Sequence, residues 1–105
     1  MLFVGYGTKN RGNLIQFSAT NNMPFYVYII QSQKDGSYYV GSTQDLDERI
    51  ERHNQGRSTY TKLKRPWKLL YFEEFPDRSS AIKRENYLKR QKSKELIESL
   101  ARTSR

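Results

Sequence analysis

The fold is decided by the segment FYVYII at residues 25–30, together with KDGS at 34–37 and YYVG at 38–41. The first segment is an unbroken apolar and aromatic run of β-forming residues, which is typical of a buried strand. An Asp-Gly pair between two such runs is a signal for a tight turn. The sequence therefore predicts a β-hairpin whose return strand ends at Gly41.

Helix and strand patterns alternate after this hairpin. Asp45 can cap a helix, because Glu48 three residues later completes a capping-box pattern. The predicted elements are that helix to about Asn54, a strand at 67–75, a helix at 81–91 and a last helix capped by Ser93. The order ββαβαα predicts an α+β fold, with a small antiparallel or mixed three-stranded β-sheet flanked by helices.

Residues 1–22 differ in composition from the rest of the chain. They mix glycine and asparagine with scattered apolar residues, and no period of 2 or 3.6 is sustained. They also have no basic start followed by an apolar run, so a secretory signal is not expected. We therefore expect a flexible N-terminal extension at 1–22 and a single folded domain at 23–105, with Met23 as a candidate for the natural start.

The chain has no cysteine and one histidine among its 105 residues, which limits its chemistry. The lack of cysteine excludes a disulfide framework, a zinc finger, an iron–sulfur cluster and a thiol nucleophile. One histidine excludes zinc sites built on two or three histidines and ribonuclease chemistry with two histidines. No segment approaches the ~20 apolar residues that span a bilayer. We therefore expect a cytoplasmic protein without a membrane partner.

The net charge of +8 is concentrated in the second half of the chain. Residues 1–48 hold three basic and four acidic residues, whereas residues 49–105 hold 16 basic and seven acidic ones. A basic half of this size fits binding to phosphates, and a solvated surface that keeps a small protein soluble explains it equally well. If the charge has a partner, nucleic acid comes before an anionic membrane surface.

Two polar residues fall on the apolar side of the first predicted helix. At 100° per residue, Arg49 and His53 lie one turn apart, within the arc that Leu46 and Ile50 need to bury. Arginine often lies at the edge of an apolar face, and a lone histidine is more often a satisfied core residue than a catalyst. The helix alone leaves both interpretations open.

Glu85 is centred on the apolar stripe of the helix at 81–91, which Ala81, Ile82 and Leu88 form. Glutamate is rarely buried without a partner, because an unpaired carboxylate pays a large desolvation cost. One explanation is a salt bridge to an arginine of an adjoining element. The other is a metal ligand, a hard oxygen donor for a Mg²⁺ ion that keeps several waters.

The tyrosines of the hairpin are a third candidate feature. Tyr28 and Tyr39 lie on its two strands, and strand alternation puts Tyr26 on the same face as Tyr28. Tyrosines on strands usually serve packing alone. A phenol also serves as an acid or base when a metal ion, arginine or histidine lowers its pKa.

In combination, these residues resemble the GIY-YIG endonuclease family. The first motif reads Tyr26-Val27-Tyr28, with tyrosine where the family has glycine, and the second reads Tyr39-Val40-Gly41, with valine for isoleucine. Arg49 and His53 follow on one helix, and Glu85 on a later one. The resemblance covers essentially the whole predicted domain, and it is greatest to the small, stand-alone single-domain group.

The resemblance implies a phosphodiesterase that uses one divalent metal ion, leaving a 5′-phosphate and a 3′-hydroxyl. Glu85 would hold Mg²⁺ or Mn²⁺. Arg49 would pair with oxygens of the scissile phosphate, a task suited to its bidentate fork. Tyr39 or Tyr28, alone or together with His53, would orient and deprotonate the attacking water, and the sequence does not choose between them.

Two departures from the family affect how nucleic acid would be held. Ser42 stands where some members have lysine, and the sequence shows no separate DNA-binding domain. The residues left to bind nucleic acid are then the basic ones of a loop and a helix end: Arg57, Lys62, Lys64, Arg65, Lys89, Arg90, Lys92 and Lys94. Such contacts are mainly to phosphate, so we expect low sequence selectivity or selection by structure, with DNA favoured over RNA.

Other interpretations stay open at this stage. The chain could be a nucleic-acid-binding module on a GIY-YIG scaffold without useful cleavage activity, or an adaptor whose basic surface meets an acidic protein or a membrane. Trp67 is able to stack on a base, but its place beside two leucines favours packing in the core.

Overall fold

Strand β1 (Phe25–Ser32) is the centre of the structure, a computed structural model that describes residues 23–103. The elements after it are β2 (Tyr38–Thr43), α2 (Leu46–Asn54), the 3-10 turn η2 (Lys62–Lys64), β3 (Trp67–Phe75), α3 (Arg78–Gln91) and α4 (Lys94–Thr103). Apart from η2, the order is the predicted ββαβαα. The extension predicted at 1–22 lies outside the described residues.

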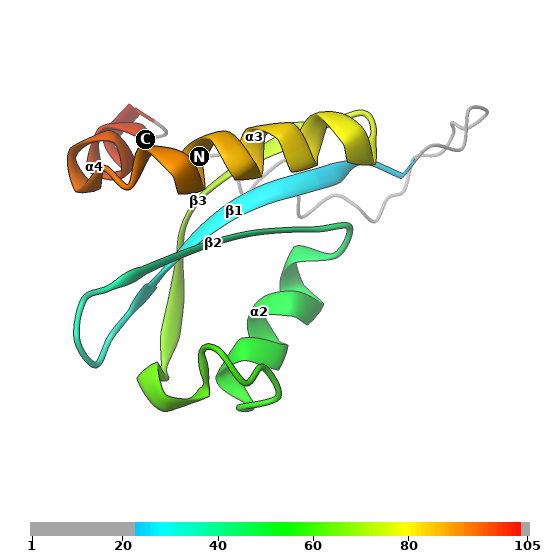
Figure 1. Ribbon diagram of the computed structural model, residues 1–105. Coiled ribbons are helices and arrows are strands. Elements are labelled where there is room, and N and C mark those ends of the chain that lie inside the picture. The colour runs from blue at the N-terminus through cyan, green and yellow to red at the C-terminus, as the bar shows by residue number, and fades with distance from the viewer. Residues whose placement is uncertain (1–22, 104–105) are drawn as a thin grey trace.

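The sheet is fully antiparallel, with strand order β2-β1-β3. Helices cover both of its faces, with α3 and α4 on one side and α2 on the other (Figure 1). A central strand between two layers of helix is buried on both sides, which explains why its sequence is apolar without alternation. The predicted α+β class is therefore confirmed.

Two layers of core result from this arrangement. The layer under α3 and α4 is aliphatic: Val27, Ile29, Val40, Ala81, Leu88 and Ile97. The layer under α2 consists of Tyr28, Ile30, Leu46 and Trp67. Because Trp67 is 5% exposed, it packs in the core as expected and is not available to stack on a base.

The helix starts differ in detail from the predictions. The Asp45 carboxylate accepts from the Glu48 amide at 3.1 Å, but the Glu48 side chain pairs with Arg52 rather than reaching back to complete the capping box. Helix α3 begins at Arg78, three residues before the predicted start, because Asp77 caps it by accepting from the Ser80 amide. The structure thereby places Arg78 in the first turn of α3.

Candidate active site

The candidate residues come from both faces of the sheet. Tyr28 and Tyr39 lie on the face that α2 covers, and Arg49 and His53 project from α2 itself. Glu85 projects from α3 on the opposite face. The two groups meet at the edge strand β2, where Ser42 contacts both Arg49 and Glu85.

A chain of buried hydrogen bonds joins Tyr28, His53 and Thr61. The Tyr28 hydroxyl lies 3.0 Å from His53 Nε2, and His53 Nδ1 lies 2.7 Å from Thr61 Oγ1. All three residues are at most 2% exposed. Either tautomer of His53 gives both ring nitrogens a partner, so the histidine is fixed in orientation from two sides.

Burial keeps this chain of hydrogen bonds neutral at physiological pH. Burial raises the pKa of Tyr28 to about 12, with the charge of Tyr39 adding to it and that of Arg49 opposing it. Burial also lowers the pKa of His53 to about 4, helped by the positive charges of Arg49 and Arg52. The ring of His53 is thus an uncharged hydrogen-bonding partner of a protonated phenol.

Gly41 leaves room for the Tyr28 hydroxyl. The two residues face each other across the β1–β2 ladder, and a Cβ added at Gly41 would lie 2.5 Å from that hydroxyl. A side chain at position 41 would therefore push the tyrosine out of its place. The glycine of the YVG motif is explained by this close approach.

Tyr39 is only partly buried, and its ring links the buried layer to the surface. The ring centroid is 5.1 Å from that of His53 and 6.3 Å from that of Trp67. On the outer side it is 6.1 Å from the ring of Tyr60, which is 80% exposed. Of the two candidate tyrosines, Tyr39 is therefore the one nearer to solvent.

Arg49 reaches the edge strand from α2. Its Nη1 donates to the Ser42 carbonyl oxygen over a long 3.4 Å, and its Nε is buried without a partner among the described residues. A buried donor without an acceptor is rare and costs free energy. The unused donor of this guanidinium is suited to an anion such as a phosphate oxygen.

Glu85 has a partner on each carboxylate oxygen. Oε1 accepts from the Ser42 hydroxyl at 2.7 Å, and Oε2 pairs with Lys89 Nζ at 2.7 Å. The Glu85 side chain is 16% exposed and that of Lys89 48%. A salt bridge is thus present, as one of the two explanations proposed, but its partner is a lysine of the same helix rather than an arginine of an adjoining element.

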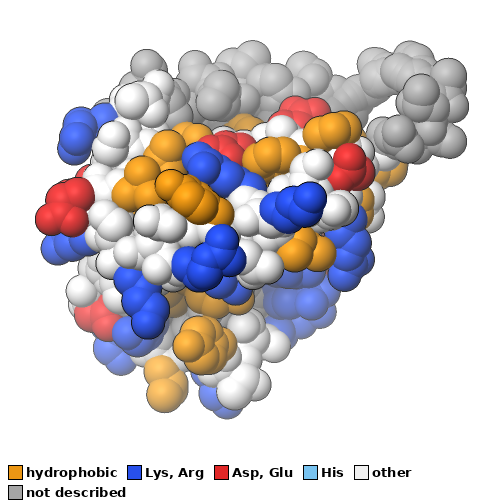
Figure 2. Space-filling view, turned by 45° about the horizontal axis from the view of Figure 1, so that its top comes forward, with side chains coloured by type: hydrophobic (Ala, Val, Ile, Leu, Met, Phe, Trp, Pro, Cys, Tyr) orange, Lys and Arg blue, Asp and Glu red, His pale blue; other side chains and the backbone are white. Residues whose placement is uncertain are grey.

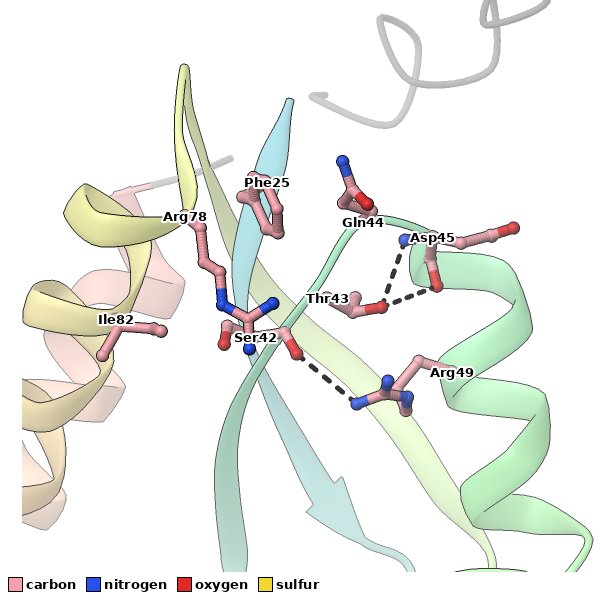
Figure 3. Close-up of a pocket in the computed structure, with 8 residues that line it drawn as sticks. All are labelled: Phe25, Ser42, Thr43, Gln44, Asp45, Arg49, Arg78 and Ile82. Atoms are coloured by element: carbon pink, nitrogen blue, oxygen red, sulfur yellow. Dashed lines mark hydrogen bonds between the residues drawn. The ribbon is translucent and has the colours of Figure 1, made fainter. Parts of the chain in front are cut away.

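A pocket of about 300 Å³ opens where the two helices approach the end of β2. Figure 3 shows Arg78 of α3 and Arg49 of α2 reaching toward Ser42 from opposite sides. Its lining is Phe25, Ser42, Thr43, Gln44, Asp45, Arg49, Arg78 and Ile82. Arg78 is missing from the residues predicted from sequence, because the predicted helix begins three residues later; the Asp77 cap is the signal that places it.

Comparison of the sequence with known proteins identifies the family of this chain. Residues 24–98 match the family described as the GIY-YIG catalytic domain. The chain belongs to the GIY-YIG family. A UPF0213 protein of Staphylococcus saprophyticus is 46% identical over 76 residues, and one of Staphylococcus aureus strain Mu3 is 43% identical over 76 residues. Each match covers 69% of this chain and 92% of the relative.

One solved structure is also similar. The UPF0213 protein BH0048 of Bacillus halodurans is 35% identical, with a TM-score of 0.49, over 77% of this chain and 85% of that one. The family match and the sequence relatives confirm the resemblance to small, single-domain GIY-YIG proteins. The family assignment points to nuclease activity on nucleic acid.

GIY-YIG nucleases generally use a divalent metal ion, and the residues present fit one. The described residues 23–103 contain no group of three or more histidine, cysteine, aspartate or glutamate side chains able to hold a metal. A tetrahedral protein site of the zinc type does not fit such a set. A divalent ion that keeps several waters and is held by one or two carboxylates plus substrate phosphate is compatible with Glu85, where it would compete with Lys89 for the carboxylate.

The basic residues predicted to bind nucleic acid form two separate groups on this GIY-YIG domain. Arg57, Lys62, Lys64 and Arg65 lie in the segment between α2 and β3, whereas Lys89, Arg90, Lys92 and Lys94 lie where α3 passes into α4. The two groups are at different ends of the molecule (Figure 1). Over the face with α3 and α4 in front, Lys and Arg side chains are interspersed with hydrophobic and acidic ones (Figure 2).

Not all of these cations are free of acidic partners. Lys64 Nζ lies 3.2 Å from an Asp35 carboxylate oxygen, and Lys89 is the partner of Glu85.

No helix within residues 23–103 has the length and apolar content that crossing a membrane requires.

Proposed function

We propose that this protein is a divalent-metal-dependent endonuclease that hydrolyses phosphodiester bonds in nucleic acid. The observation that carries the proposal is the contact made by Ser42 with both Arg49 and Glu85. These contacts bring a guanidinium with an unused donor and a carboxylate together at one strand edge, although they come from opposite faces of the sheet. A protein that only bound nucleic acid would have no need of an acid there.

Glu85 is proposed to hold one Mg²⁺ or Mn²⁺ ion, which would polarise the phosphate and stabilise the leaving oxygen. Arg49 would bind the scissile phosphate and offset the charge that grows in the transition state. Arg78 lines the same pocket as Arg49, and Ser42, which contacts Glu85, also lines it. We propose that Arg78 supplies the second phosphate contact that some family members obtain from a lysine at the position of Ser42.

We propose that Tyr39 is the residue that activates the attacking water. This side chain is partly buried beside His53 and reaches the surface, whereas Tyr28 is 1% exposed and its hydroxyl is bonded to His53. Tyr39 would therefore orient the water and, as a phenolate that has first released its own proton to solvent, take a proton from it. Tyr28 and His53 would act through it, because their hydrogen bond fixes the layer of rings against which Tyr39 packs.

We propose nucleic acid as the substrate, with DNA favoured over RNA and with selection by structure rather than by sequence. Cations at both ends of the domain support a nucleic-acid substrate that is not selected by sequence, because phosphate contacts carry little sequence information. Arg57, Lys62 and Arg65 have no acidic partner among the described residues, unlike Lys64. Binding is expected to weaken steeply as salt concentration rises.

The test compares wild type with Glu85→Gln and with Glu74→Gln, a matched control at an exposed acid on β3. Each is incubated with plasmid, single-stranded DNA, branched DNA and RNA, with Mg²⁺ or Mn²⁺ and with chelator. Glu85→Gln should lose metal-dependent cleavage of whichever substrate is cut, and Glu74→Gln should keep it. Cleavage by Glu85→Gln at the wild-type rate would overturn the assignment.

The alternative is a binding module without useful cleavage activity on the same scaffold. The lysine already bound to Glu85 is the observation that favours it. It predicts salt-sensitive binding of nucleic acid by wild type and by both variants, with no metal-dependent nicking of any substrate.

A further inference from the structure

The segment between α2 and β3 presents an aromatic ring to solvent. Tyr60 is 80% exposed and Leu63 is 76% exposed, on either side of Thr61, which is 1% exposed. A single exposed apolar residue needs no explanation. Here, however, the centroid of the exposed ring lies 6.1 Å from that of Tyr39, a residue of the candidate active site. The exposed ring is therefore next to that site.

The backbone under this ring is firmly anchored. The Thr61 hydroxyl is bound to His53, and the Thr61 carbonyl accepts from Trp67 Nε1 at 3.0 Å. Three residues on, the Lys64 carbonyl accepts from the buried Ser32 hydroxyl at 2.7 Å. A ring on a fixed backbone loses little conformational freedom when a ligand covers it.

The charged residues of the segment that carries the ring are all basic. Residues 56–66 contain four basic residues and no acidic one, and Lys62 comes directly after the anchored Thr61. Cations that track a phosphate backbone beside an aromatic ring that receives a base are the pattern of proteins that bind single-stranded nucleic acid. A lipid surface offers no flat partner for the exposed ring, whereas every nucleotide of a single strand offers one.

We propose that Tyr60 is a stacking platform for one unpaired base, next to the phosphate that the candidate active site would bind. The proposal deepens the endonuclease function and rests on it for the position of that phosphate. A paired base inside a duplex hides both of its faces between its neighbours, and exposing one costs unstacking energy. The substrate class is therefore single-stranded nucleic acid, or a strand with a flipped, bulged or terminal base.

The first experiment measures binding in a Glu85→Gln background, so that the result does not depend on cleavage. Fluorescence anisotropy gives the affinity for a single-stranded oligonucleotide and for a blunt duplex of the same sequence. Tyr60→Ala should weaken single-strand binding roughly 5- to 150-fold, the range found for loss of one base–aromatic stack. Tyr60→Trp should keep the affinity, and duplex binding should change much less.

Tyr87→Ala is the matched control, because Tyr87 is a 41% exposed tyrosine on α3 with Arg84 over its ring. It should leave single-strand binding unchanged. Equal affinity of Tyr60→Ala and its parent, or an equal loss on single strand and duplex, would overturn the proposal. If wild type cuts nothing but Tyr60→Ala still weakens single-strand binding selectively, the nuclease function fails while the platform stands.

A second experiment separates stacking from a merely structural role of Tyr60. Each nucleotide of the single strand is replaced in turn by an abasic one. With Tyr60 present, one position should weaken binding far more than the others; with Tyr60→Ala, that position should lose its effect. A scan with the same profile for both proteins would contradict base stacking on this ring.

Discussion

The two faces of the sheet differ in how they hold the helices that cover them. Under α3 and α4 the fully buried layer is aliphatic, and its main directional contact, the ion pair of Arg84 with Glu73, is only partly buried. Under α2 the buried layer includes the polar side chains of Tyr28, His53 and Thr61, joined by hydrogen bonds. Buried polar groups are costly unless they are paired, so each bond also fixes an orientation.

The two faces of the sheet contribute different parts of the candidate site. The face under α2 holds its aromatic side chains in fixed orientations, whereas the face under α3 contributes a carboxylate at its edge. Ser42 of the edge strand contacts groups from both. Substitutions on either side of this strand should therefore have effects of different kinds, on turnover at the edge and on stability in the layer under α2.

The largest effect is expected from Arg49→Ala, which removes the proposed phosphate contact on the α2 side. Turnover should fall about 10²- to 10³-fold, as it does when a preorganised transition-state donor is lost. Arg52→Ala on the same helix is the control, because Arg52 pairs with Glu48 at the surface. Single-turnover kinetics with metal, alongside binding without it, separates the two: equal turnover by the two variants would contradict the role of Arg49.

The next effect concerns pH and the buried histidine. The pKa of His53 falls from about 6.5 in the unfolded chain to about 4 in the folded protein. The unfolded chain therefore takes up the proton first, so stability present above pH 6.5 is lost as pH falls toward 4. The loss attributable to His53 should reach about 3 kcal/mol.

Chemical denaturation of wild type and His53→Gln between pH 7.5 and 4 measures this difference. The free energy of unfolding of wild type should fall more steeply, and the gap between the two proteins should close at low pH. Parallel curves would show that His53 does not titrate as its burial requires. The comparison of slopes also removes the contribution of the other titrating groups, which the two proteins share.

The fold could be predicted from the sequence because its signals are local. The FYVYII run, the Asp-Gly turn and the Asp45 cap each report on a few neighbouring residues, and the structure confirms the hairpin and the cap. The predicted start of α3 is wrong by three residues, since several residues from Asp77 onward are able to cap a helix and Asp77 is the one that does. The later start leaves Arg78 outside the predicted helix.

The contacts within the candidate site could not be predicted to the same extent, because they join residues far apart in the chain. The helical period shows that Arg49, His53 and Glu85 fall on buried sides, but not which groups they meet. Thr61 carries no pattern of its own, and its bond to His53 depends on how the segment after α2 folds back. Lys89 is an exception, because its i,i+4 spacing from Glu85 is a local signal of the observed salt bridge.

A smaller effect is expected from Gly41→Ala, which disturbs the α2 face from the edge strand. The added methyl would meet the Tyr28 hydroxyl, and overpacking of this kind costs about 1–3 kcal/mol. Thermal unfolding should show a lower Tm than wild type. An unchanged Tm would mean that the Tyr28 ring gives way to the methyl group, so the hydrogen-bonded layer under α2 would not fix its side chains in orientation.

The smallest effect is expected from Lys89→Gln, which acts on the α3 side alone. A divalent ion on Glu85 competes with Lys89 for the same carboxylate, so removing the lysine should strengthen metal binding. The salt bridge is about half exposed on its lysine side, and such pairs contribute roughly 0.2–1 kcal/mol, which is about a 1.5- to 5-fold change in affinity. Titration with Mn²⁺ in the absence of nucleic acid measures it, with Arg90→Gln, an exposed neighbour on α3, as the control for the lost charge. If the two variants bind Mn²⁺ equally, the effect is one of net charge rather than of the Lys89–Glu85 pair.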